Sequence, residues 1–197
     1  MTRDQLLALG LGAKAIAYRA RIGRLHRVHL GIYAVGRRPV TPTERASAAV
    51  LACGPGAVLS HRSAAALWGL LKRWEAPLEV TTTKDRRPKG IKVHRTTTLH
   101  RDEITRHVGI PVTTPARTIL DIAPALNAAL IRTVNDALLS PYLTRETLAA
   151  VIRAHTRCPG ARLLEPFITT TDGPTRSGFD DDFLRFCRRF GLPIPRI

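Results

Sequence analysis

Basic residues and one aromatic residue share a face of a short segment near the N-terminus. If residues 13–22 form a helix, a rotation of about 100° per residue places three side chains on the face opposite Ile16: Lys14, Tyr18 and Arg21. An apolar stripe turned inward beneath a cationic outer face is the pattern of a helix that lies in a nucleic-acid groove. A solvated amphipathic helix with arginines snorkelling over the surface has the same pattern and is the alternative.

More cations follow this helix directly. Arg19 belongs to it, and further arginines come just after it, on residues that predict a β-hairpin. The strands of that hairpin are expected at 25–29 and 32–35, with a turn at Gly31, where glycine allows a positive φ. Side chains there can reach phosphates or the minor groove beside the helix. The expected contacts with double-stranded DNA are therefore Lys14, Tyr18, Arg19, Arg21, Arg24 and Arg27.

The elements that must position these side chains begin with the first residues of the chain. Thr2 is the expected N-cap of a helix over residues 3–9, and Gly10 and Gly12 separate that helix from the next one. Helix, glycine turn, helix and hairpin follow in the order of a winged helix-turn-helix. We predict this DNA-binding domain over residues 1–38, and Pro39 and Pro42 mark the linker after it.

The net charge favours a polyanionic partner. The 197 residues hold 31 Lys and Arg against 15 Asp and Glu, which gives a formal charge of +16 at pH 7. The excess is +7 over residues 1–45, +7 over residues 46–120 and only +2 over residues 121–197. The base composition of a GC-rich genome explains why arginine is used in place of lysine. It explains less well why Asp and Glu are scarce near the N-terminus.

Composition excludes several classes of protein. With 44% hydrophobic residues the chain can build a core, which disordered basic tails cannot. No apolar run reaches the roughly 18 residues that cross a bilayer, and the N-terminus has no signal-peptide pattern. Three distant cysteines fit neither a disulfide framework nor a zinc cluster. We therefore expect a cytoplasmic protein with no membrane segment, no metal and no cofactor.

The rest of the chain predicts an α+β fold with a mixed α/β middle domain and a C-terminal helical segment. Helices are expected at 43–53, 60–70, 116–123, 126–139, 144–155, 159–168 and 175–190, and strands at 78–83, 91–96 and 110–113. The basic segment Lys84–Lys89 is interpreted as a β-turn that contacts phosphate, contacts a partner or is simply solvated. After the first domain we predict a middle domain, a helical segment and a terminal segment, at 39–125, 126–172 and 173–197.

Several stretches of the sequence resemble a known family. The most distinctive read TPTER at Thr41–Arg45, GPGAVLSHRSAAALWGL at Gly54–Leu70 and GIPVTTPART at Gly109–Thr118. Together with TRDQLLALGL at Thr2–Leu11 and GRLHRVHLGIYAV at Gly23–Val35, they resemble the AbiE-type (AbiEi) antitoxins. The three distinctive stretches resemble the actinobacterial kind, in which an antitoxin-like head precedes a very-short-patch-repair-like nuclease domain of the PD-(D/E)XK class. The resemblance covers nearly the whole chain.

This resemblance implies a function as well as a fold. It implies a DNA-binding transcriptional repressor in a type IV toxin–antitoxin system, with a nucleotidyltransferase-like toxin as the partner that it neutralises. It also implies that the six residues named above contact DNA. Residues 173–197 would be the first helix of the nuclease-like domain, with Asp180 at the position of a helix acid.

The same resemblance bears on whether the chain is an enzyme. Metal-assisted phosphodiester cleavage needs carboxylates that converge from separate elements, and a lysine. The strands expected to carry them would follow Pro195, and the sequence ends at Ile197. We therefore expect no catalytic residues and interpret Asp180–Asp182 as a solvated cluster near a helix start. The alternative function is a truncated or decayed endonuclease of this class.

Two smaller patterns are interpreted as structural. Ser60 and His61 are adjacent and their side chains are expected to point apart, so Ser60 is assigned as a helix cap rather than a nucleophile. His26 and His29 have no cysteine partners nearby, so a zinc site is not expected there.

Overall fold

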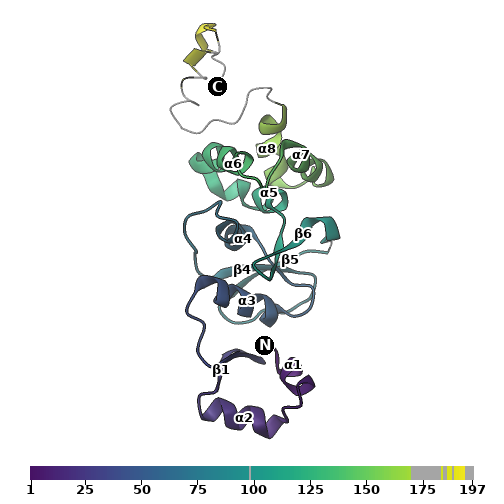
Figure 1. Cartoon of the computed structure of the whole chain (residues 1–197). Helices are drawn as coiled ribbons and strands as arrows, with labels where there is room; N and C mark the ends of the chain where they lie inside the picture. The colour runs from purple at the N-terminus through teal and green to yellow at the C-terminus, as the bar shows by residue number, and fades with distance from the viewer. Residues whose placement is uncertain (98, 170–182, 184–185, 188, 194–197) are drawn as a thin grey trace. The chain divides into compact units, whose positions relative to one another are not determined.

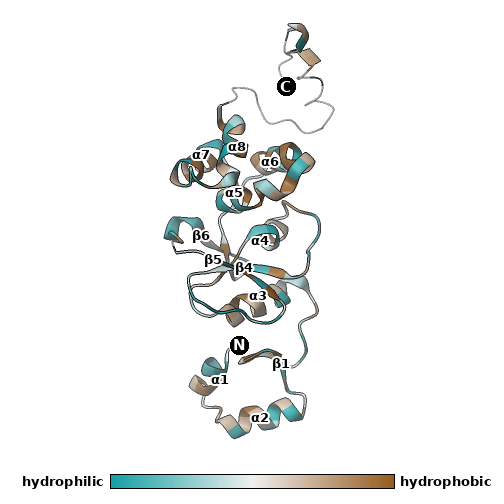
Figure 2. Ribbon diagram, turned by 180° about the vertical axis from the view of Figure 1, so that it is seen from behind, coloured by the Kyte–Doolittle hydropathy of each residue, from teal (hydrophilic) through white to brown (hydrophobic). Residues whose placement is uncertain are grey.

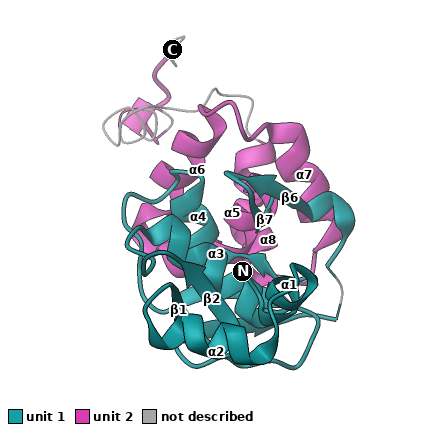
Figure 3. Ribbon diagram, turned by 60° about the horizontal axis from the view of Figure 1, so that its bottom comes forward, with its two compact units in different colours: residues 1–114 teal, residues 115–197 magenta. Residues whose placement is uncertain are grey.

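The computed structural model describes residues 1–97, 99–169, 183, 186–187 and 189–193 (Figure 1). The chain divides into two compact units, residues 1–114 and residues 115–197, which Figure 3 colours separately. Unit 1 holds both β-sheets, and the described part of unit 2 is helical. This mixture of helices and strands confirms the predicted α+β class.

Unit 1 begins with two helices and a hairpin, at almost the predicted bounds. They are α1 (Arg3–Ala8), α2 (Ala13–Arg21), β1 (Leu25–His29) and β2 (Ile32–Val35). The Thr2 hydroxyl caps α1 as predicted, and the Gln5 side chain completes a capping box. Leu6, Ile16 and Leu25 form a small core that joins α1, α2 and β1.

The first residue of the chain takes part in the hairpin ladder. The Met1 ammonium donates to the Tyr33 carbonyl at 2.8 Å, and the Tyr33 N–H donates to the Met1 carbonyl at 2.8 Å. Thr2 forms an antiparallel bridge with Ile32. The chain start therefore lies along the free edge of β2 and covers it with hydrogen bonds.

A five-stranded mixed sheet follows, in the order β5-β4-β3-β7-β6. Its strands are β3 (Val58–Leu59), β4 (Leu78–Thr82), β5 (Ile91–Arg95), β6 (Ile104–His107) and β7 (Ile110–Thr113), and a single 3-10 turn, η1 (Arg101–Glu103), precedes β6. The sequence prediction missed β3, whose two residues are too few to show alternation, and β6, which has only one apolar residue, Ile104, among its four.

The pairing of β4 with β5 corrects a second prediction. The two strands are parallel, with Leu78 opposite Ile91 and Thr82 opposite Arg95. The predicted β-turn between them is therefore wrong, because a tight turn joins antiparallel strands. Residues 83–90 instead run back along the length of β4 before β5 begins.

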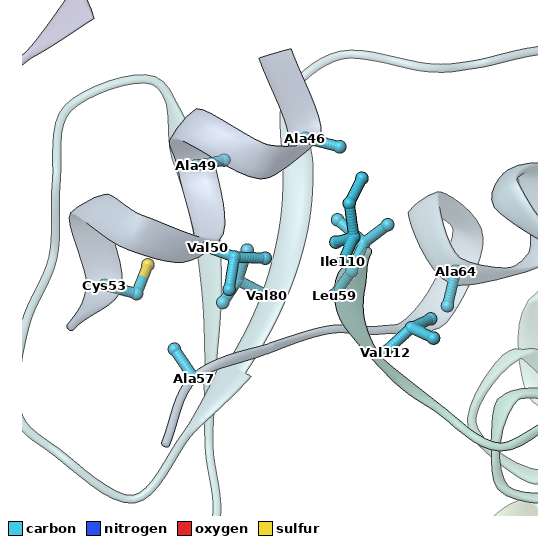
Figure 4. Packing of buried hydrophobic residues seen from close by; sticks show 10 residues of the cluster. All are labelled: Ala46, Ala49, Val50, Cys53, Ala57, Leu59, Ala64, Val80, Ile110 and Val112. Carbon is cyan, nitrogen blue, oxygen red and sulfur yellow. The ribbon is translucent and has the colours of Figure 1, made fainter. Parts of the chain in front are cut away.

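Two helices, α3 (Pro42–Cys53) and α4 (His61–Leu67), lie on opposite sides of this sheet (Figure 1). The Thr41 hydroxyl caps α3, and Glu44 completes the capping box. The face that α3 turns to the sheet consists of small side chains. Figure 4 shows this packing, which joins Ala46, Ala49, Val50 and Cys53 to Leu59, Val80, Ile110 and Val112.

The described part of unit 2 consists of helices: α5 (Pro115–Leu126), a 3-10 turn η2 (Asn127–Ala129), α6 (Leu130–Leu138), α7 (Arg145–Ala154) and α8 (Pro159–Thr169). The prediction of one helix over 126–139 is wrong, because Asn127 takes a left-handed φ of 44° and separates α5 from α6. The predicted helix at 175–190, with Asp180–Asp182, lies mostly outside the described residues.

A glycine allows α8 to approach α5 within unit 2. A Cβ atom at Gly160 would overlap the carbonyl oxygen of Leu120 and lie 3.1 Å from its carbonyl carbon. The apolar side chains around this contact are fully buried, among them Ile119, Leu148 and Leu164. The core of unit 2 is therefore built where α5, α7 and α8 meet.

Candidate nucleic-acid interface

Helix α2 presents the predicted cationic face to the outside. Lys14 and Arg21 are exposed and Tyr18 is 53% exposed, whereas Ile16 is only 2% exposed. The Arg21 guanidinium lies over the Tyr18 ring, 5.4 Å from its centroid, and this cation–π contact holds the two side chains together. Figure 2 shows hydrophilic and hydrophobic residues side by side along α2. The helix thus has one side in the small core and a cationic side in solvent.

The other three predicted contacts lie on and after the end of α2. Arg24 and Arg27 are exposed, and Arg19 is half-buried. The Arg24 N–H donates to the Arg19 carbonyl at 2.9 Å, and the Gly36 N–H donates to the Arg24 carbonyl at 3.0 Å. Hydrogen bonds of the main chain therefore fix the bend that carries these arginines from the helix into the hairpin.

We call Lys14, Arg19, Arg21, Arg24 and Arg27 the α2–β1 basic surface. Within residues 1–97 and 99–169, no carboxylate forms an ion pair with any of these five cations. Other cations of unit 1 are paired, as Arg37 is with Glu44 at 2.6 Å. Cations without acidic partners suit a phosphate backbone, because each phosphate they neutralise releases condensed counterions.

Further positive groups of unit 1 line two hollows. One is lined by Lys84, Arg86 and Arg87 of the 83–90 connection and by Arg95 of β5. The other is lined by Arg3, Arg86 and Arg106, together with residues 54–57 after α3. Asp85, the acidic residue of this connection, forms only a long, exposed ion pair with Arg87, at 3.8 Å. The positive charge predicted for this segment is therefore accessible, as a contact with phosphate or with a partner would require.

The residues at the start of α4 differ from expectation in the way their side chains point. The prediction that Ser60 and His61 point apart is wrong: the His61 backbone takes φ 51°, and its Nδ1 lies 3.1 Å from the Ser60 Oγ. Ser60 is the N-cap residue of α4 as predicted, but its hydroxyl makes no capping bond and instead accepts from Thr81 Oγ1 at 2.8 Å. Ser60 is fully buried, so a substrate cannot reach it as a nucleophile.

Glu79 is the charged centre of the same region, and its side chain is 8% exposed. Lys92 Nζ donates to its Oε1 at 2.8 Å, the Arg62 N–H donates to its Oε2 at 3.2 Å, and His94 Nε2 lies 3.6 Å from Oε2. Burial raises the pKa of Glu79, but the neighbouring His94, Lys92 and Arg62 groups outweigh it and lower this pKa to about 2.

This polar group, hereafter the α4 cluster, comprises Ser60, His61, Glu79, Thr81, Lys92 and His94. Sequence reasoning missed it, although a signal was present. Glu79 and Thr81 lie on either side of Val80 in β4, and Lys92 and His94 lie on either side of Val93 in β5. Two polar strand faces that meet in a sheet predict a polar cluster there, once the strands are known to be neighbours.

Comparison with protein families identifies the second half of unit 1 and most of described unit 2. Residues 56–165 match the model of the AbiEi antitoxin C-terminal domain. The chain belongs to the AbiEi antitoxin family. The matched segment begins just before β3, ends within α8 and covers more than half of the 197 residues. As an AbiEi antitoxin, the protein has an antitoxin-like role in a toxin–antitoxin system, with a toxin as partner. A comparison with curated proteins finds no match.

AbiEi membership confirms the resemblance carried by Gly54–Leu70 and Gly109–Thr118. The α2–β1 basic surface lies outside the matched segment, and so does the nuclease-like terminal segment, which stays a prediction. The family description names an antitoxin rather than an enzyme. Across the described residues of this AbiEi antitoxin, every helix is too short or too polar to span a bilayer.

Proposed function

We propose that this antitoxin binds duplex DNA through a winged helix-turn-helix at residues 1–38 and represses transcription of its own operon. The observation that carries the proposal is the α2–β1 basic surface, which has four exposed cations and the half-buried Arg19, none with an acidic partner among the described residues. The apolar side of α2 packs into the small core through Ile16, so the side of the helix that can contact a ligand is the cationic one.

Helix α2 is the proposed recognition helix. Lys14, Tyr18 and Arg21 face the major groove, where lysine and arginine pair with guanine and the tyrosine contacts base edges or phosphate. Ala13 and Ala17 are exposed on the same helix and are small enough to let its backbone approach the groove. The antiparallel hairpin β1–β2 is the proposed wing.

The arginines that follow α2 have the role of anchors. Arg24 and Arg27 contact phosphates beside the groove, and Arg19 supports them from the last turn of the helix. Phosphate contacts of this kind set the register of the protein on DNA and make its affinity depend on salt.

A DNA-binding titration tests the proposal. Fluorescence anisotropy is measured with DNA from upstream of the protein's own gene and with random DNA, at several salt concentrations. We expect tighter binding to the upstream DNA and a log–log salt slope as steep as about −4.5 if all five cations neutralise phosphates. Arg21→Ala is expected to weaken binding to the upstream DNA by about 10-fold or more and to reduce the preference for that DNA over random DNA.

Arg153→Ala is the matched control, because Arg153 is an exposed helical arginine in the last turn of α7. Its affinity and salt slope are expected to equal those of the wild type. Equal affinity for upstream and random DNA, together with an Arg21→Ala variant that behaves like the wild type, would refute the proposal.

The partner that we propose for the antitoxin role is a nucleotidyltransferase-like toxin, in a type IV system. The family match at residues 56–165 supports an antitoxin role for the region after the basic surface. Co-expression with the neighbouring toxin gene tests this separately from repression. Arg21→Ala is expected to lose repression and still restore growth, whereas growth inhibition that the wild-type chain cannot relieve would contradict the assignment.

A further inference from the structure

Three residues of the α4 cluster are of types that ligate metals. His61 begins α4, Glu79 lies on β4 and His94 lies on β5. One ligand atom from each lies within 4.8 Å of the other two. Two imidazoles and one carboxylate are a donor set typical of Zn²⁺ and neighbouring divalent metals. We propose that His61, Glu79 and His94 form a binding site for a divalent transition metal ion of the Zn²⁺ class.

The parallel register of β4 and β5 brings the strand ligands together. Glu79 is opposite Lys92 and Thr81 is opposite His94, so these four residues share one face of the sheet. Val80 on the other face packs into the core beneath α3. The first residue of α4 stands over the polar face, and the imidazole rings of His61 and His94 stack there with centroids 3.5 Å apart.

The ring of His94 has an unsatisfied nitrogen. Its Nε2 is buried and makes no hydrogen bond, since the Glu79 Oε2 atom lies 3.6 Å away. Buried polar atoms in proteins nearly always have a partner, and each exception calls for an explanation. A metal ion between His94 Nε2 and the Glu79 carboxylate would satisfy both groups at once.

The surroundings of His61 are those of a metal-binding histidine. Its Nδ1 lies 3.1 Å from Ser60 Oγ, and that oxygen is itself fixed by the Thr81 hydroxyl at 2.8 Å. Histidine ligands commonly use one ring nitrogen for such a bond, which orients the other toward the metal. The left-handed backbone of His61, with φ 51°, is the kind of strain that persists at functional sites.

The distances require a small closure of the side chains on binding. Zn²⁺ bonds of about 2.0–2.2 Å in tetrahedral geometry place ligand atoms about 3.3 Å apart. The three ligand atoms are at most 4.8 Å apart, so the largest approach needed is about 1.5 Å. The rings of His61 and His94, which are stacked in this structure, must also tilt away from each other so that their nitrogens point to one ion.

Lys92 gives the proposal a distinctive signature. Its ammonium holds Glu79 Oε1, whereas His94 faces Oε2, so Lys92 and the metal share the carboxylate and compete for its charge. The other nearby cation, Arg62, is held by Glu75 through two hydrogen bonds of 2.7 and 2.6 Å. Removing the Lys92 charge should therefore strengthen metal binding, although it removes a contact from the cluster.

The test is a titration of the full chain with Zn²⁺ by calorimetry and with Co²⁺ by visible absorption. A Cys158→Ser background removes the partly exposed thiol. We expect one ion per chain. The affinity should weaken by about 100-fold in His94→Ala and in Glu79→Gln, each of which removes a ligand, and tighten by about 10-fold in Lys92→Met. His29→Ala changes a histidine of β1 outside the cluster and is the matched control. It should bind the metal ion with the same affinity as the Cys158→Ser chain.

Three results would overturn the proposal. One is the absence of stoichiometric binding to the chain. Another is binding that persists unchanged in both His94→Ala and Glu79→Gln, or a Co²⁺ spectrum with a thiolate charge-transfer band, each of which places the ion at other residues. The third is an unchanged or weaker affinity in Lys92→Met, which keeps all three ligands and therefore decides the matter even where a ligand variant fails to fold.

Discussion

Replacing Gly160 by alanine sets two physical effects against each other. Alanine is the better helix former, so propensity alone predicts a gain of about 0.5–1 kcal/mol in the free energy of unfolding. The new Cβ atom, however, would overlap the carbonyl oxygen of Leu120. That oxygen belongs to the backbone of α5 and cannot rotate away as the end of a side chain can.

The packing effect should win. Overpacking in a filled core costs about 1–3 kcal/mol, and here α5 and α8 must separate at the point where the core of unit 2 is built. We expect Gly160→Ala to lower the free energy of unfolding by about 2 kcal/mol, a sign opposite to that expected from helix propensity.

Urea unfolding followed by circular dichroism at 222 nm measures the loss, and amide hydrogen exchange assigns it. Faster exchange is expected in α5 and α8, with the helices of unit 1 unchanged. Arg162→Ala is the control, because Arg162 is exposed on the same helix and should change stability by less than about 0.5 kcal/mol. A Gly160→Ala chain as stable as the wild type, or more stable, would show that the close approach of α8 to α5 is wrong.

Two further predictions concern unit 1. The low pKa of Glu79, about 2, means that the ionised carboxylate stabilises the fold above its unfolded pKa and that this stability is lost as the pH falls toward 2. In metal-free buffer, the free energy of unfolding of the wild type should fall between pH 5 and pH 2.5, and in Glu79→Gln this fall should be smaller by about 2 kcal/mol. Equal falls in the two chains would contradict this. Thr41→Ala removes the cap of α3 and should cost about 1 kcal/mol in urea unfolding, whereas the exposed Ser47→Ala on the same helix should cost almost nothing; equal effects would contradict the capping box.

Local signals in the sequence predicted local structure well. Thr2 caps α1 as predicted and forms a capping box with Gln5 three residues later. Thr41 and Glu44 have the same spacing and form a capping box at the start of α3, which was not predicted although the signal was present. The spacing of Ile16 against Tyr18 predicted which side of α2 is buried. Each of these features depends on residues within one or two turns of each other, so a short stretch of sequence contains the cause.

Features set by distant contacts were missed or misread. Nothing near residues 83–90 states that β5 lies parallel to β4, because the direction of a strand depends on its neighbour across the sheet. Ser60 and His61 meet because the Thr81 hydroxyl and the His94 ring, from other elements, hold them. Asn127 breaks a helix that has apolar residues at suitable spacing, since asparagine tolerates the left-handed backbone.

The pairing of Met1 with Tyr33 has a practical consequence for anyone who purifies this antitoxin. A fusion tag at the front would replace the ammonium that donates to the Tyr33 carbonyl and would carry extra residues past the hairpin edge. Those residues would extend past Tyr33, which pairs with Arg27 of β1, and acidic residues among them would compete electrostatically with an oligonucleotide. Affinity handles are better attached away from Met1, where they leave its two hydrogen bonds with Tyr33 intact.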